Sequence, residues 1–319
     1  MTFPDKVRIV EVGPRDGLQN EKLFIPTSVK VELIERLQDA GLRHIETTSF
    51  VSPAWVPQMA DNAAVMDKLK RRDDVVYSVL VPNMKGYEAA LSSRPNEIEV
   101  FASASESFSQ KNINCSIEQS MTRFAPVVSA ARAAGIAVRG AISCALGCPY
   151  EGDIPPSHVR HVAQLMRDIG VQHVAIADTI GIGTPRKAQA ALEAALAVYP
   201  LEDVSVHFHD TYGQALVNIY AALGLGVRQI DASVSGLGGC PYAKGATGNV
   251  ATEDVVYLLH GMDIETGIDL DKLSDAGFFI RDALGKPSGS AVARARAAIR
   301  TERAAAGGNN GGTCVPCPA

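Results

Sequence analysis

Short apolar runs alternate with helix-like segments along most of the chain. Residues 7–12 form a β-branched run, and residues 29–40 then carry apolar side chains at helical spacing. Gly41 provides a helix stop, because glycine adopts the left-handed conformation at little cost. Repetition of this order predicts strands at residues 7–12, 44–50, 75–81, 97–101, 137–143, 173–177, 204–209 and 229–234.

Strands that alternate with helices are expected to pair in parallel, which an open doubly wound sheet or a closed barrel would satisfy. The even repetition, and the absence of a glycine-rich nucleotide fingerprint after the first strand, favour the barrel. The predicted fold is therefore α/β, a single (β/α)8 TIM barrel. Residues 271–285 and 289–305 are predicted as extra C-terminal helices, which gives one catalytic domain at 1–305 and a tail at 306–319.

Composition narrows the class of protein further. The chain has 319 residues, of which 46% are hydrophobic and 20% charged, as in an ordinary soluble globular protein. Its net charge of -5 argues against a nucleic-acid-binding surface. No apolar run approaches the roughly 20 residues of a membrane span, and the N-terminus lacks a secretory pattern. We therefore expect a cytoplasmic enzyme without a nucleic-acid or membrane partner.

The six cysteines do not have the density of a small disulfide-bonded scaffold. Cys314 and Cys317 form a CxxC motif, but a Gly/Asn-rich stretch precedes them. Such stretches rarely order themselves, so a flexible tail is expected. A redox role for these two cysteines stays open.

Two histidines at the end of a predicted strand are candidates for metal binding. Alternation along the strand places His207 and His209 on one face and Phe208 on the other. Catalytic groups of a barrel lie at the C-terminal ends of its strands, where two imidazoles form half of a metal site. Asp210 directly precedes a predicted helix, so a helix cap is the better interpretation of its side chain.

The segment after the first strand presents Arg15 and Asp16 in a turn shaped by Gly13 and Pro14. From the spacing alone, this is either a functional turn or a surface turn with a salt bridge. Residues 236–249 form a glycine-rich loop after the last strand. Cys240 in this loop is a candidate proton donor, because thiol pKa values are readily tuned, but the loop could equally be structural.

Two carboxylates at strand ends complete the candidates. Glu46 lies on the second strand and Asp178 follows the sixth. A carboxylate inside a barrel is costly unless a cation meets it, so we expect Arg15 or a metal as the partner of each. The two residues are acid–base groups, residues that orient a ligand, or members of structural ion pairs.

Several longer motifs resemble the family of 3-hydroxy-3-methylglutaryl-CoA lyases, within the wider group of metal-dependent barrel lyases and Claisen-type synthases. The Arg-Asp turn and the His-x-His motif occur throughout the wider group, whereas the cysteine-containing glycine loop is specific to the lyases. The resemblance spans about residues 7–300. Its motifs lie at residues 11–21, 48–53, 55–59, 111–116, 143–150, 178–181 and 236–243, with Asn249.

The resemblance assigns a role to each candidate residue. It implies that Mg²⁺ or Mn²⁺ is bound by Asp16, His207, His209 and Asn249. It implies that Arg15 stabilises an enolate and Cys240 protonates it, with Glu46 and Asp178 as supporting acidic residues. Substrate and coenzyme A contacts are expected at Arg15, Gln19, Lys22, Lys111, Asn112 and Thr179.

The implied reaction is cleavage of 3-hydroxy-3-methylglutaryl-CoA to acetyl-CoA and acetoacetate, as in leucine degradation and ketone-body formation. The base that removes the hydroxyl proton is Asp16 or His207. A homodimer is also implied. The alternatives are a lyase for substrates with a longer branch at C3, a Claisen-type synthase that uses a 2-oxo acid, and a non-catalytic barrel that binds an acyl-CoA.

Overall fold

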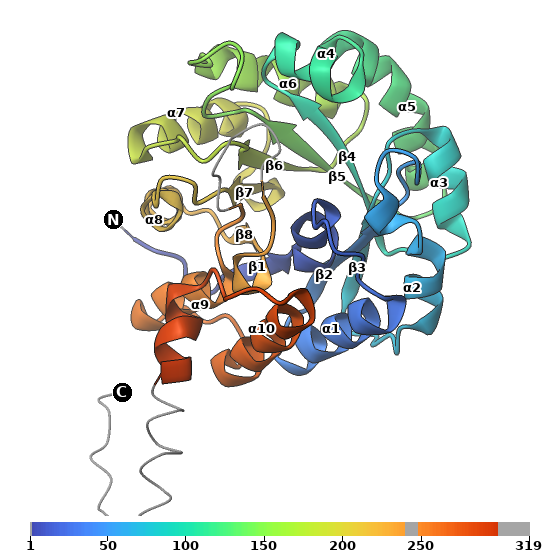
Figure 1. Cartoon of the computed structure of the whole chain (residues 1–319). Coiled ribbons are helices and arrows are strands. Elements are labelled where there is room, and N and C mark those ends of the chain that lie inside the picture. Colours follow the sequence, from blue (N-terminus) through green and yellow to red (C-terminus); the bar gives the residue numbers. More distant parts are fainter. Residues whose placement is uncertain (1, 240–247, 299–319) are drawn as a thin grey trace, which may run out of the picture.

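The described residues of the computed structural model are 2–239 and 248–298. They form a closed barrel in which the strands follow one another in chain order and β1 closes against β8 (Figure 1). All pairings between neighbouring strands are parallel, which confirms the predicted (β/α)8 barrel. The strands are β1 (Arg8–Glu11), β2 (His44–Ser49), β3 (Val76–Leu80), β4 (Glu97–Ser103), β5 (Ala137–Ser143), β6 (His173–Asp178), β7 (Val204–Phe208) and β8 (Gln229–Ala232).

Each strand is followed by at least one helix, and the helices surround the barrel (Figure 1). Ser116 begins α5 with a capping box that it forms with Gln119, and Pro185 begins α7 as its sequence predicts. The helices are α1 (Thr27–Asp39), α2 (Asn62–Lys68), α3 (Met84–Leu91), α4 (Glu106–Ile113), α5 (Ile117–Ala133), α6 (Pro156–Asp168), α7 (Pro185–Leu196), α8 (Ala215–Leu223), α9 (Thr252–Gly261) and α10 (Leu270–Leu284).

The expected extra helices begin with α10, which packs against α1 on the outside of the barrel. Gly285 ends α10 in the left-handed conformation, with φ 64°. Residues 291–298 are also helical, within the predicted helix at 289–305. The remainder of that helix, and the tail at 306–319, lie outside the described residues.

The interior of the barrel contains charged side chains. Arg139 of β5 forms an ion pair with Asp231 of β8, although β5 and β8 are not neighbours in the barrel. The pair therefore spans the interior, and both side chains are almost fully buried. The apolar core lies mainly outside this layer, between strands and helices, as with Ile45 of β2 and Leu33 of α1.

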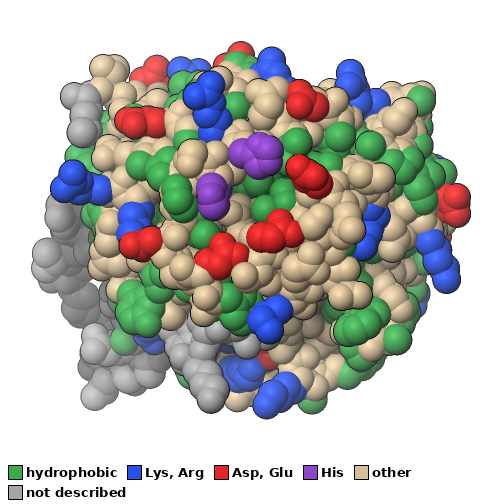
Figure 2. Space-filling model, turned by 90° about the horizontal axis from the view of Figure 1, so that it is seen from above, with side chains coloured by type: hydrophobic (Ala, Val, Ile, Leu, Met, Phe, Trp, Pro, Cys, Tyr) green, Lys and Arg blue, Asp and Glu red, His purple; other side chains and the backbone are tan. Residues whose placement is uncertain are grey.

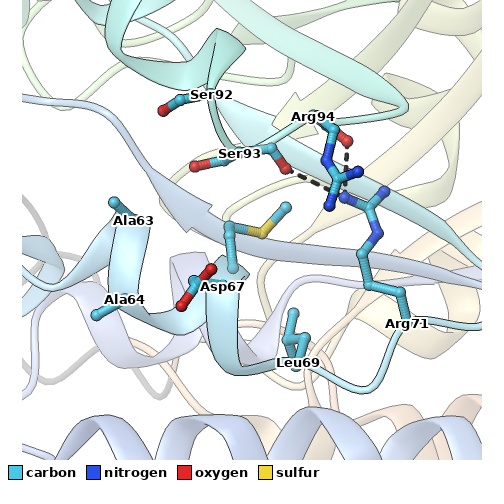
Figure 3. Close-up of a pocket in the computed structure, with 9 residues that line it drawn as sticks. Ala63, Ala64, Asp67, Leu69, Arg71, Ser92, Ser93 and Arg94 are labelled. Carbon is cyan, nitrogen blue, oxygen red and sulfur yellow. Dashed lines mark hydrogen bonds between the residues drawn. The ribbon is translucent and has the colours of Figure 1, made fainter.

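The outer surface over α4–α6 carries charged and histidine side chains among hydrophobic ones (Figure 2). Acidic and histidine side chains line a cavity of about 350 Å³ there, among them Glu118, His158 and His161. A second cavity, of about 570 Å³, lies where β3 and β4 begin, opposite the catalytic end of a barrel (Figure 3). Arg71 beside it donates to the carbonyl oxygen of Arg94 at 2.7 Å. Within residues 2–239 and 248–298, no helix is long and apolar enough to cross a membrane.

Two buried glutamates fix the chain just after β8, in the 3₁₀ turn η4 (Val234–Gly236). Glu11 accepts hydrogen bonds from the amides of Gly13 and Val234, each at 2.8 Å. It therefore joins the turn after β1 to η4. Glu253 of α9 accepts a hydrogen bond from the Ser235 amide at 2.8 Å.

Replacing Glu253 with Gln is expected to change how stability depends on pH. Burial raises the pKa of Glu253 from 4.5 to about 8. The folded protein then keeps a proton that the unfolded chain releases, so the wild-type free energy of unfolding falls as pH rises from about 4.5 to about 8. Relative to Glu253→Gln, the loss approaches about 1.4 kcal/mol per pH unit. Urea unfolding at pH 5–8.5 measures this, with the exposed Glu118→Gln as control; parallel curves for Glu253→Gln and wild type would contradict it.

Candidate metal centre

Three side chains that are far apart in the sequence converge at the C-terminal end of the strands. Asp16 lies in η1 (Gly13–Gly17), a π-helical turn after β1. His207 lies on β7, and His209 follows the end of that strand. One potential ligand atom from each residue lies within 4.8 Å of the other two. The structure therefore brings together three of the four predicted metal ligands.

The two histidines share a face as the strand alternation predicts. Their ring centroids are 5.5 Å apart, and Phe208 between them is buried in the apolar core. Asp210 turns away from them, because its Oδ1 accepts a hydrogen bond from the Ala215 amide at 2.9 Å. Ala215 is the first residue of α8 and Gln214 is its N-cap residue, so Asp210 is not the N-cap but its side chain does accept from the first amide of the helix.

Asn249, the fourth predicted ligand, reaches the cluster through the backbone after the glycine loop. Residues His209 and Asn249 form an isolated antiparallel bridge. The Asn249 side chain donates to Asp16 Oδ2 at 2.7 Å and to the Leu237 carbonyl oxygen at 3.2 Å. Asn249 thus lies directly beside the carboxylate of the cluster.

The protonation states of this cluster suit a cation. Burial opposes ionisation of Asp16, but Arg15, the two histidines and Asn249 hold its pKa at about 2. Burial, together with the neighbouring His207, lowers the pKa of His209 to about 4. Burial acts to lower the pKa of His207, but Asp231, Asp16 and Glu99 raise it overall. At neutral pH the cluster therefore offers the Asp16 carboxylate and the neutral imidazole of His209, which are ligands of divalent cations.

Arg15 lies between the metal cluster and Glu46. Its Nη1 contacts Asp16 Oδ1 at 2.8 Å, and its Nε contacts Glu46 Oε1 at 2.6 Å. Its Nη2 is 3.5 Å from Glu99 Oε1. The expectation that Glu46 meets Arg15 is therefore confirmed, and the surface-turn interpretation of Arg15 is wrong because its side chain is 7% exposed. The three carboxylates raise the pKa of Arg15 against the effect of burial.

Six charged side chains form a continuous network of ion pairs under the cluster, which we call the charge network. Its carboxylates are Asp16, Glu46, Glu99 and Asp231, and its guanidinium groups are Arg15 and Arg139. Burial raises the pKa of Glu46 to about 8 and also raises the pKa of Glu99, so these two carboxylates retain protons more readily than Asp16 and Asp231. Two imidazoles and a carboxylate, with a nearby amide, are groups that can bind a divalent cation.

Asp178 is placed differently from the expectation. Its carboxylate accepts hydrogen bonds from the amides of Ile182 at 3.2 Å and Gly183 at 2.8 Å. The expected cationic partner is therefore replaced by backbone N–H groups that order the turn before α7. Burial raises the pKa of Asp178 to about 6. Thr179 likewise accepts a hydrogen bond from the Cys144 amide at 2.8 Å.

The ends of the glycine loop lie beside the metal cluster. Asn20 donates a hydrogen bond to the Gly239 carbonyl oxygen at 3.2 Å. Gly238 has φ 120°, and a Cβ there would lie 2.8 Å from Asn249 Nδ2, so glycine is required. Cys240 itself lies outside the described residues. Its neighbour Gly239 is nevertheless hydrogen-bonded to Asn20, four residues after Asp16.

The residues expected to contact coenzyme A lie at the surface or near it. Lys22 and Asn112 are exposed, and Gln19 is partly buried. Lys111, near the end of α4, lies over the Tyr150 ring at 5.1 Å from its centroid. Their contacts with coenzyme A stay a prediction.

Comparison with known proteins identifies the family. The family model described as HMGL-like matches residues 6–280. The chain belongs to this family. Its sequence is 55% identical over 293 residues to the mitochondrial hydroxymethylglutaryl-CoA lyase of Gallus gallus, which covers 92% of this chain and 98% of that protein.

One bacterial relative and two solved bacterial structures are also similar to this HMGL-like lyase. It is 56% identical over 295 residues to the 3-hydroxy-3-isohexenylglutaryl-CoA/hydroxymethylglutaryl-CoA lyase of Pseudomonas aeruginosa, covering 92% of this chain and 98% of that protein. The crystal structure of a hydroxymethylglutaryl-CoA lyase from Pseudomonas aeruginosa matches with a TM-score of 0.92 and 55% identity, over 94% of this chain and all of that one. A lyase from Acinetobacter baumannii, solved with coenzyme A and 3-methylmalate, matches with a TM-score of 0.88 and 35% identity, over 92% and 96% of the chains.

Sequence reasoning missed three members of the charge network in this HMGL-like lyase. They are Glu99 on β4, Arg139 on β5 and Asp231 on β8. Each lies in a strand whose neighbouring residues are apolar and buried. A charged residue inside such a strand is a signal of an interior ion pair, because an unpaired buried charge is costly.

Replacing His209 with Ala is expected to weaken Mn²⁺ binding by at least about 10–100-fold, the usual cost of losing even an outer partner of a metal site. Isothermal titration calorimetry of the metal-free protein measures this affinity. His158→Ala, an exposed histidine on α6, is the matched control and should bind Mn²⁺ like the wild type. Equal affinities for all three proteins would exclude His209 as a ligand.

Proposed function

We propose that this HMGL-like lyase cleaves 3-hydroxy-3-methylglutaryl-CoA to acetyl-CoA and acetoacetate, using Mg²⁺ or Mn²⁺. The observation that carries the proposal is the convergence of Asp16, His207 and His209 beside the buried guanidinium of Arg15. The relatives that match over nearly the whole chain bear the name of this activity. Asn249 completes the proposed ligand set, since its side chain contacts Asp16.

The proposed chemistry requires stabilisation of a thioester enolate. A bound cation would orient the tertiary hydroxyl of the substrate and make it more acidic. Asp16 or His207 takes the hydroxyl proton as the C2–C3 bond breaks, and the electron pair of that bond passes to the enolate. Arg15 stabilises the negative charge on the enolate oxygen. A guanidinium that is already held in place needs no reorganisation during the reaction, which makes such stabilisation effective.

Cys240 completes the reaction by donating its thiol proton to the enolate carbon, which gives acetyl-CoA. Its position in the chain supports this role, because Gly239 and Asn249 flank the loop and both contact the segment around Asp16. A proton donor in a glycine-rich loop would also help to exclude water from the carbanion if the loop closes on the substrate.

Glu46 and Asp178 support the site from beside the proposed ligands, and the carbonyl oxygen of Asp178 accepts a hydrogen bond from the His209 amide at 3.3 Å. Glu46 holds Arg15, and burial together with Glu99 raises the pKa of Glu46 against the effect of Arg15. Asp178 orders the turn at residues 181–183, at the end of β6 beside β7. We propose that both are positioning residues. The homodimer and the cytoplasmic location stay predictions.

A longer branch at C3 is the second candidate substrate, because the name of the Pseudomonas aeruginosa relative covers both an isohexenyl and a methyl compound. We expect the methyl substrate to give the highest kcat/KM in a panel of 3-hydroxy-3-alkylglutaryl-CoA thioesters with Mg²⁺. Release of acetyl-CoA in a coupled assay measures this. A higher kcat/KM for the isohexenyl substrate would favour the second candidate, and release of free coenzyme A only with a 2-oxo acid and acetyl-CoA would indicate a synthase.

Replacing Cys240 with Ala is expected to lower kcat by about 10²–10⁴-fold, the usual contribution of a positioned proton donor. Mn²⁺ affinity should remain that of the wild type, because no ligand is removed. Turnover assays and calorimetry on the same preparation check both expectations. Cys115→Ala is the control for loss of a thiol, because Cys115 is a buried cysteine outside the proposed site. Wild-type turnover in Cys240→Ala would rule out the proton-donor role.

A further inference from the structure

Asp231 contacts the proposed metal ligand His207 on the side of the ring that faces away from Asp16. Its Oδ2 lies 3.2 Å from Nδ1 of His207. The other ring nitrogen of His207, Nε2, faces Asp16, with 3.9 Å between Nε2 and Asp16 Oδ2. An imidazole that binds a metal through one nitrogen commonly donates a hydrogen bond from the other nitrogen to a carboxylate.

This contact decides how the His207 ring is oriented. A hydrogen on Nδ1 would satisfy Asp231 and leave the lone pair of Nε2 free toward the cluster. Without Asp231, the ring could turn over or carry its hydrogen on Nε2, and both changes would remove the lone pair from the metal side. The hydrogen bond therefore selects the ring orientation and the tautomer that a metal needs.

Asp231 is itself held across the barrel. Nη2 of Arg139 contacts both carboxylate oxygens of Asp231, with 2.6 Å to Oδ1, and also Ser205 Oγ at 3.0 Å. The Arg139 and Asp231 side chains are 1% and 2% exposed. Because β5, β7 and β8 contribute these residues, the position of the carboxylate is fixed by the barrel itself.

We propose that Asp231 is a positioning residue for metal binding, which holds His207 with Nε2 toward the cation while Arg139 holds Asp231. The inference rests on the proposed metal dependence of the enzyme. Asp231 belongs to no ligand set, and its effect on the cation passes through His207. Loss of Asp231 should therefore weaken metal binding only while His207 is present.

A double-mutant cycle on the metal-free protein tests this dependence. Asp231→Asn, nearly isosteric with the wild type, should lower Mn²⁺ affinity by about 10–100-fold in calorimetry. In the His207→Ala background, Asp231→Asn should change the remaining affinity by less than about twofold. Equal losses in both backgrounds would overturn the proposal, because the effect would then not pass through His207.

Asp61→Asn is the matched control for general damage to the fold. Asp61, which immediately precedes α2, forms an ion pair of low exposure with Lys30 of α1 at 2.7 Å, outside the barrel interior. It should lower the urea midpoint and leave Mn²⁺ affinity unchanged. If Asp231→Asn behaves in the same way, Asp231 is merely structural and the proposal falls.

A measurement on the unaltered protein is independent of how the variants fold. Long-range ¹H–¹⁵N spectra of the Mg²⁺-loaded wild type should show His207 with its hydrogen on Nδ1. A hydrogen on Nε2 would overturn the proposal even if the metal binds. Failure of the wild type to bind Mn²⁺ or Mg²⁺ would instead overturn the proposed metal-dependent function, which separates the two failures.

Discussion

The ion pair between Arg139 and Asp231 spans the barrel interior, and the arrangement of the catalytic end depends on it. A buried carboxylate without a cation would be costly, and so would a buried guanidinium without an anion. Further charged side chains extend from this pair in space. Glu99 contacts both Arg139 and Arg15, and Arg15 contacts Asp16. On the other side, Asp231 contacts His207. Each of these buried charged side chains contacts a group of opposite charge, which offsets the cost of burying it.

The fold could be predicted from local patterns along the sequence. Glycine stops and β-branched runs repeat at even spacing, and eight evenly repeated strand–helix units without a nucleotide fingerprint favour a closed barrel over an open sheet. The strand boundaries differ by a few residues; β8, for example, ends at Ala232 because η4 follows it. The histidine pair was also accessible, since alternation fixes the shared face of His207 and His209 without knowledge of the rest of the barrel.

The charge network could not be predicted in the same way, because its central Arg139–Asp231 ion pair joins β5 and β8, which are not neighbours in the barrel. Glu99 and Arg139 are register partners on the neighbouring strands β4 and β5, but no short sequence motif indicates that alignment. The sequence did predict Glu46 with Arg15, where a strand-end carboxylate and a nearby turn made the pairing plausible. For Asp178 the same reasoning was wrong, because the amides of Ile182 and Gly183 satisfy the carboxylate in place of a cation. The energetic cost of burying a charge shows which side chains need a partner, but it does not show which partner the fold provides.

The proposed metal site would also link metal binding to the stability of the fold. Asp16, His207 and His209 are far apart in the sequence and converge only in the folded barrel. A cation that binds the folded state alone stabilises it in proportion to the logarithm of its concentration over its dissociation constant. Asp231 contacts His207 and Glu46 contacts Arg15, so the buried contacts that orient the proposed catalytic groups lie directly beside the proposed ligands.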